Sequence, residues 1–287
     1  MKRILICTDG SIFAQSSYQY GAWFARRLGA TVKVLYVTDA RSRAAVKARN
    51  FSGSIGVDAS EQLLNKLVSL EYEKAKLDHQ QAKLILQDAQ AVLMGHGVEE
   101  VQSIHETGFL LDCLEQFEPQ VDLMVLGKRG QTADFASSHL GANVERIVRS
   151  SRHPCLITSR DFQTIERVLL SYDGSSSGQN VLNFLLKSPL FQGLELHIVT
   201  VGKGEEDKTA HARLDEAGER ARQGGFDPIC SLRIGNPETA IAEYVQAQSI
   251  NLLLMGAYGH SRIRHLIIGS TTVQILRRST IPVLVFR

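Results

Sequence analysis

The chain has 287 residues, which is too long for one ordinary domain and suits two domains of roughly 140 residues each. Its composition, 44% hydrophobic and 22% charged, is typical of a soluble protein. The formal charge of +2, without a basic tract, gives no reason to expect a nucleic-acid partner. No apolar run approaches the ~18 residues of a membrane helix, and the N-terminal sequence lacks the features of a signal peptide. We therefore expect a cytoplasmic protein without a membrane partner.

Short apolar runs alternate with longer segments of helical period along the chain. The runs are continuous rather than alternating, which indicates a parallel sheet covered on both faces. A unit that repeats strand and helix up to a fifth strand is a doubly wound α/β sheet. In the first half the pattern predicts strands over 4–7, 32–37, 121–126 and 155–157, and a helix over 14–28 that stops at Gly29.

Four blocks of the first half recur in the same order in the second half. The spacing is also kept, because 28 positions separate Asp9 from Val37 and Asp173 from Val201. We therefore expect two tandem doubly wound, five-stranded parallel-sheet (Rossmann-like) domains, over residues 1–160 and 165–287. The matched blocks are 4–11 with 168–175, 32–37 with 195–201, 121–127 with 250–256, and 153–157 with 281–285.

The two copies differ most between their second and third strands. The first copy uses about 60 residues there and the second about 27. Residues 59–93 have the pattern of one long, charged amphipathic helix with repeated leucines. We interpret this helix as structural, either an extended surface helix or an arm that contacts a partner.

Asp9 and Asp173 each follow the first strand of their copy. In an open parallel sheet, ligands bind beyond the carboxyl ends of the strands where the strand order reverses. An Asp-Gly-Ser turn also serves as a helix cap, so the two interpretations, cap and ligand contact, stay open at this point.

The second copy carries a glycine pattern typical of a phosphate site. Gly256 and Gly259 are followed by nine residues and then by Gly269 and Ser270 at the start of a helix. Glycines allow backbone amides to approach an anion, and a helix N-terminus adds unpaired N–H groups. The hydroxyls of Ser270 and Thr271 are able to cap the helix and to donate to phosphate oxygens.

With these residues the second copy resembles the universal stress protein family, whose ATP-binding members carry G-x-x-G, nine residues, then G-[S/T]. The resemblance covers essentially the whole chain as a tandem of two such domains. It implies that Asp173 faces the adenosine, that the backbone at Val201 meets the adenine, and that the glycine motif holds ribose and phosphates. It also implies an internal pseudo-dimer of the two copies, packed through 155–158 and 283–286, and leaves a further homodimer open.

The first copy departs from this motif. Ten residues separate Gly130 from Gly141, Ala142 replaces the hydroxyl residue, and Asp134 adds a negative charge. We expect the added residue to shift Gly141 relative to Gly130 and thereby misalign the phosphate-binding amides. The second copy should therefore bind the nucleotide, while the first mainly supports it.

The favoured function is a non-catalytic stress-response protein that binds ATP or another adenine nucleotide. One alternative is a nucleotide phosphohydrolase, but the sequence has no G-x-x-x-x-G-K-[S/T] loop, no paired carboxylates and no identifiable catalytic triad. The other is a nucleotide-independent interaction or scaffold protein. No metal-ligand set is evident, and we expect Mg²⁺ to reach Asp173 only through a nucleotide.

Overall fold

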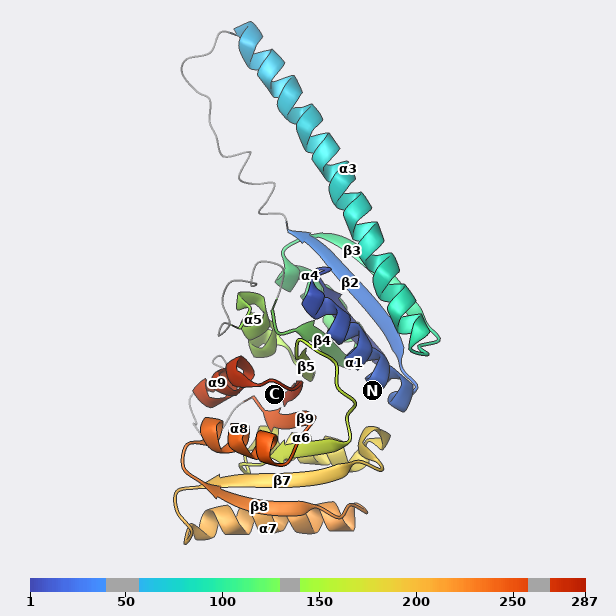
Figure 1. Ribbon diagram of the computed structural model, residues 1–287. Coiled ribbons are helices and arrows are strands. Elements are labelled where there is room, and N and C mark those ends of the chain that lie inside the picture. Colours follow the sequence, from blue (N-terminus) through green and yellow to red (C-terminus); the bar gives the residue numbers. More distant parts are fainter. Residues whose placement is uncertain (40–56, 130–139, 258–268) are drawn as a thin grey trace.

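The computed structural model describes residues 1–39, 57–129, 140–257 and 269–287 (Figure 1). The first copy begins with a strand and a helix that ends at Gly29, whose left-handed conformation (φ 57°) suits glycine. Its elements are β1 (Arg3–Thr8), α1 (Ile12–Leu28), β2 (Thr31–Asp39), α3 (Val57–Gly95), β3 (Val101–Gly108), α4 (Leu110–Phe117), the 3₁₀ helix η1 (Glu118–Gln120), β4 (Leu123–Gly127), α5 (Ala142–Ser150) and β5 (Cys155–Thr158).

The second copy repeats this order with a shorter helix in place of α3. Its elements are β6 (Arg167–Ser171), α6 (Ser176–Lys187), the 3₁₀ helix η3 (Pro189–Phe191), β7 (Glu195–Gly202), α7 (Lys208–Gln223), β8 (Ile229–Ile234), α8 (Pro237–Ala247), β9 (Leu252–Gly256), α9 (Ser270–Arg278) and β10 (Val283–Phe286).

Each copy contributes five parallel strands, and the two sets join into one ten-stranded sheet. The strand order is β3-β2-β1-β4-β5-β10-β9-β6-β7-β8, so in each copy the order reverses beside the first strand. The expected doubly wound fold is confirmed, but the two sheets are continuous rather than separate. They join where β5 pairs antiparallel with β10, with Leu156 opposite Leu284, which is the expected packing of the two copies.

The sheet separates two hydrophobic cores, and each core extends across both copies. Alternate strand residues face opposite sides. Ile4 and Leu170 belong to the core under α1, α3, α6 and α7. Leu5 and Leu169 belong to the core under α4, α5, α8 and α9. No helix in the described ranges combines the length and hydrophobicity needed to span a bilayer.

The connection between the copies is bound to α1 rather than hanging free. The Tyr20 hydroxyl lies 3.2 Å from the Asp161 carbonyl and accepts a hydrogen bond from the Gln163 amide at 3.0 Å. The Tyr20 ring also packs against Phe162, with centroids 4.8 Å apart. These contacts fix the path from β5 to β6.

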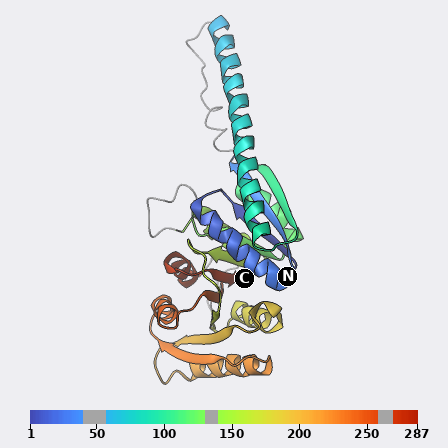
Figure 2. The same cartoon turned by 45° about the vertical axis from the view of Figure 1, so that its right-hand side comes forward.

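Helix α3 spans Val57–Gly95, slightly beyond the predicted 59–93. Its C-terminal part packs against β2, β3 and α1, while its N-terminal part projects well past the rest of the molecule (Figures 1 and 2). The insertion in the first copy is therefore an arm.

Candidate functional site

The candidate site lies at the carboxyl ends of β6 and β9, the neighbouring strands between which the order reverses in the second copy. Ser171 pairs with Met255, so the turn that begins at Asp173 and the strand end at Gly256 are adjacent. The first turn of α6 lies between them. A Cβ added at Gly256 would clash with the Ser177 side chain, and one at Gly178 would lie 2.8 Å from Asp173 Oδ1.

Asp173 organises the turn into α6. Its Oδ1 accepts hydrogen bonds from the Ser175 amide at 2.9 Å and the Ser175 hydroxyl at 2.6 Å. Ser175 in turn accepts from the Gly178 amide at 3.1 Å and is the N-cap of α6. The cap is thus Ser175, and Asp173 orients it from a half-buried position. Gly174 has a φ of +73°, a conformation in which a side chain would be strained.

The start of α9 presents backbone and hydroxyl groups to this region. The helix begins at Ser270, and Gly269 occupies the N-cap position without a side-chain cap. The expected capping by Ser270 or Thr271 is therefore absent, and both residues are exposed. Thr272 is instead buried, and its hydroxyl donates to the Ala257 carbonyl at 3.2 Å. No acidic residue occupies the first turn, so nothing there opposes an anion.

Two glycines of the motif have different reasons to be glycine. Gly256 is required by the close approach of Ser177, whereas Gly269 has an ordinary extended conformation (φ −56°, ψ 136°). A Cβ at Gly269 would meet no atom of the described residues closer than 3.5 Å. Packing against the described residues therefore does not explain why this position is a glycine. Gly259, the remaining glycine of the motif, lies outside the described residues.

Val201 lies near the carboxyl end of β7, half-buried and paired with Arg233 of β8. Because β7 neighbours β6, its backbone reaches the same edge of the sheet as Asp173. The predicted residues within the described ranges therefore all lie at the carboxyl-end edge of the second copy.

Arg213 is a charged residue of this region that sequence reasoning missed. It projects from α7 over the Asp173 turn, and a Cβ added at Gly174 would lie 3.1 Å from its Cγ, Cδ and Nε atoms. The corresponding residue of the first copy is Ile85, whose Cδ1 would lie 2.6 Å from a Cβ at Gly10. Nothing in the local sequence marks Arg213, because it follows Asp173 by 40 residues and reaches it only through the fold.

The first copy keeps the backbone geometry of the site despite its longer loop. Gly141 donates to the Lys128 carbonyl at 3.2 Å, as Gly269 donates to the Ala257 carbonyl at 3.2 Å. The extra residue therefore does not move the helix start away from the end of β4. The first turn of α5 does carry Glu145, an acidic residue that α9 lacks at this place.

Lys128 serves the junction between the copies. Its Nζ donates to the carbonyls of Arg277 at 2.6 Å and Ser279 at 2.8 Å, at the C-terminus of α9. A cation is favourable at this end of the helix dipole. Burial, together with Arg129, lowers the pKa of Lys128 to about 8.

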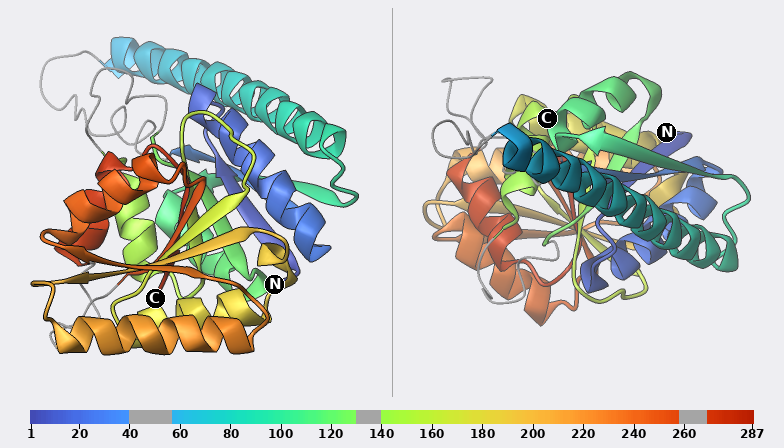
Figure 3. Two further views of the ribbon diagram at one scale, coloured as in Figure 1. Left: turned by 60° about the horizontal axis from the view of Figure 1, so that its bottom comes forward. Right: turned by 90° about the horizontal axis from the view of Figure 1, so that it is seen from above.

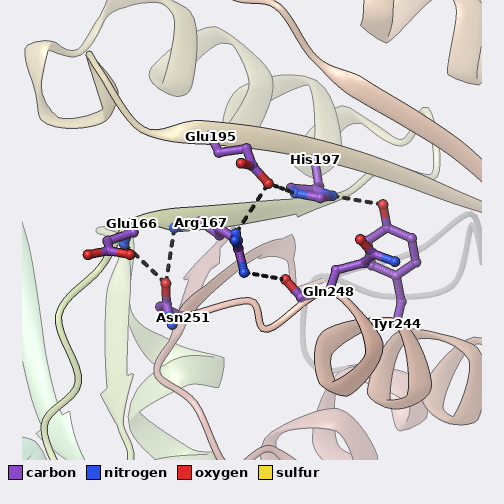
Figure 4. A network of polar contacts seen from close by, with 7 residues as sticks. All are labelled: Glu166, Arg167, Glu195, His197, Tyr244, Gln248 and Asn251. Atoms are coloured by element: carbon purple, nitrogen blue, oxygen red, sulfur yellow. Dashed lines mark hydrogen bonds and ion pairs between the residues drawn. The ribbon is translucent and has the colours of Figure 1, made fainter.

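A polar network supports the second copy at the other end of its strands (Figure 4). The buried His197 shares hydrogen bonds with Glu195 at 2.7 Å and with the Tyr244 hydroxyl of α8 at 2.8 Å. The bond with His197 lowers the pKa of Glu195. The network fixes β7 against α8 and is completed by Glu166, Arg167, Gln248 and Asn251.

These features define a tandem, doubly wound α/β protein with a candidate anion-binding helix start at the switch point of its second copy. Sequence comparison then gives the family. The sequence model of the universal stress protein family matches residues 1–159 and again 164–287. The chain belongs to the universal stress protein family.

Individual relatives agree with this assignment. The chain is 56% identical to the universal stress protein Slr1230 of Synechocystis sp. (strain ATCC 27184 / PCC 6803 / Kazusa) over the full length of both. A universal stress protein from Archaeoglobus fulgidus DSM 4304 has the same fold, with a TM-score of 0.71, 22% identity, and coverage of 99% of this chain and 98% of that one. A universal stress protein solved in complex with cAMP aligns with 44% of this chain and 98% of its own, at 26% identity and a TM-score of 0.37.

Proposed function

We propose that the second copy binds an adenine nucleotide, with ATP as the expected ligand, and that it does not catalyse a reaction of this nucleotide. The observation that carries this proposal is the start of α9. The hydroxyls of Ser270 and Thr271 are exposed. Together with the first amides of the helix they border the space that Gly269, having no side chain, leaves open among the described residues. Asp173 and the Val201 backbone lie at the same sheet edge and supply acceptors for the adenosine.

Binding rather than catalysis is proposed because the described residues contain no side-chain set suited to hydrolysis. Within the described residues, no group of three or more His, Cys, Asp and Glu side chains could hold a metal ion directly. Any Mg²⁺ would then arrive on the nucleotide phosphates. We expect a coupled phosphate-release assay to show no turnover above the buffer rate; saturable ATP hydrolysis would instead support a phosphohydrolase.

The experiment that tests the site compares the two copies by calorimetry with ATP. We expect about one site per chain and a loss of roughly ten- to a hundredfold in affinity for Asp173→Ala, which removes a charged acceptor. Gly269→Val should also weaken binding, because its side chain would occupy the space before α9, where an added Cβ meets no described atom closer than 3.5 Å.

The first copy supplies the matched controls. Asp9→Ala and Gly141→Val make the same changes at corresponding positions, and we expect both to leave ATP affinity unchanged. Equal losses from the two sets, or two equivalent sites per chain, would contradict the assignment to the second copy. Absence of any binding would favour a nucleotide-independent interaction protein.

A further inference from the structure

Helix α3 has one face that packs on the protein and one that does not. Ala82, Leu86, Ala89 and Leu93 are buried, and the last three belong to the core beneath the helix. Toward its N-terminus the helix leaves the sheet and projects from the molecule (Figures 1 and 2), and Figure 3 shows it as a single continuous rod. A lone helix in water gains little stability without a packed apolar face.

The unpacked face carries leucines at strict seven-residue spacing. Leu70, Leu77 and Leu84 are 52%, 64% and 67% exposed. Because seven residues make nearly two helical turns, these side chains lie in one row, roughly opposite Ala82 and Leu86. Leu67 lies three residues before Leu70 and completes the alternating three- and four-residue spacing of a coiled-coil seam. We call Leu67, Leu70, Lys74, Leu77, Gln81 and Leu84 the leucine stripe.

We propose that the leucine stripe pairs with the same stripe of a second copy of this chain, as a parallel, in-register coiled coil. In that arrangement every stripe residue meets its own counterpart, so four of the six layers contain only leucine. An antiparallel pair centred on the stripe would set Lys74 against Leu77 and Leu70 against Gln81, and only its two end layers would be purely apolar. The pattern therefore favours the parallel arrangement.

The charges beside the stripe form one attractive and one repulsive pair on each side in this register, so the register rests on the leucine layers. Lys66 lies one flanking position before Glu71 of the opposite helix, the spacing at which parallel coiled coils form interhelical ion pairs. By the same spacing Glu73 lies beside Asp78 of the opposite helix, which is a repulsive pair, and these carboxylates surround the two Lys74 side chains that meet in the seam. Polar residues at such core positions fix register and oligomer state, and they lower stability.

The dimer should be reversible. The helix is already formed and anchored by its buried end, which lowers the ordering cost of association. The seam is about three heptads long with two polar layers, well below a standard interface of about 1,600 Å². We therefore expect a monomer–dimer equilibrium that shifts with protein concentration.

Sedimentation equilibrium over a range of concentrations tests the proposal. The wild type should dimerise, and the double variant Leu70→Glu/Leu77→Glu should shift the dissociation constant upward by at least about a hundredfold, since like charges would face each other. Val68→Glu/Tyr72→Glu is the matched control: those side chains are 60% and 74% exposed on the opposite side of the same helix segment. This control should dimerise as the wild type does.

A wild type that stays monomeric, or a control pair that dissociates equally, would overturn the proposal. Orientation is tested separately with Gln81→Cys, which in a parallel register brings two thiols together and should give a disulfide-linked dimer on mild oxidation. Lys76→Cys, on the outer side of the helix, should give no disulfide-linked dimer. The oxidised wild type shows how much cross-linking the native cysteines give. Failure of Gln81→Cys to cross-link in a chain that dimerises would refute the parallel register.

Discussion

Asp122 and Asn251 both accept hydrogen bonds from the backbone amides at the start of the first strand of their copy, although one is a carboxylate and the other an amide. Asp122 accepts hydrogen bonds from the amides of Lys2 and Arg3 at 2.8 and 3.1 Å, at the start of β1. Asn251 accepts from the amides of Glu166 and Arg167 at 3.1 and 3.0 Å, at the start of β6. Only the carboxylate titrates: the hydrogen bond from the Arg3 side chain, helped by the two amides, lowers the pKa of Asp122 to about 2.

This difference predicts that the stability contributed by Asp122 depends on pH, whereas that contributed by Asn251 does not. A carboxylate with a lowered folded-state pKa stabilises the protein fully above its unfolded-state pKa, near 4, and that stabilisation is lost as the pH falls toward about 2. Asp122→Asn should therefore lower the melting temperature near pH 6, by about 2 °C at most for an exposed pair. The gap should close near pH 2, and a gap that persists there would show that the carboxylate charge is not the cause.

Arg213 gives a second prediction at this scale. Its guanidinium lies over the Asp173 turn, where the first copy has Ile85. Arg213→Ile copies the first copy's residue, so the turn keeps a covering side chain and loses only the charge. On the proposed function, we expect ATP affinity to fall by roughly tenfold and its salt dependence to weaken. Unchanged affinity in calorimetry would place Arg213 outside the site.

At the scale of elements, α9 is held at both ends. Its N-terminus lies at the candidate site, and its C-terminal carbonyls accept two hydrogen bonds from Lys128 of the other copy. Lys128→Met should remove both bonds and leave carbonyls without a charged donor, at a cost of about 1.5–3 kcal/mol. Hydrogen exchange should rise at the last turn of α9 and in β10, while β2 and β3 stay protected. Uniform changes across the sheet would indicate a different role.

The sequence patterns predicted the strands, the repeat and the long helix, because each depends on local hydrophobic spacing. They missed features that depend on approach in space. Nothing near Lys128 in the sequence indicates that its side chain reaches across the junction to α9. The expected shift of Gly141 relative to Gly130 stays a prediction, because Gly130 and Asp134 lie outside the described residues, but a backbone hydrogen bond to Lys128 keeps the helix start beside the end of β4. Loop length therefore says little about where the following helix begins.

At the scale of the whole molecule, the two copies share one sheet and two cores. Leu156 and Leu284 pair at the centre of the junction, and neither side chain is exposed. We expect the wild type to unfold in a single calorimetric transition. The double variant Leu156→Ala/Leu284→Ala should lose about 2–5 kcal/mol per site and separate the unfolding of the copies into two transitions. Two transitions in the wild type would show that the copies already unfold independently.

Fusion of the two copies in one chain also removes a symmetry constraint. In a dimer of identical chains, any substitution occurs at both symmetry-related positions, so a residue that suits one subunit is imposed on the other. Here Ile85 covers the turn at Gly10, and Arg213 covers the corresponding turn at Gly174. The amides at the start of the first strand bond to the carboxylate of Asp122 in one copy and to the side-chain amide of Asn251 in the other. A single chain is thereby free to devote one half to a ligand and the other to holding an arm.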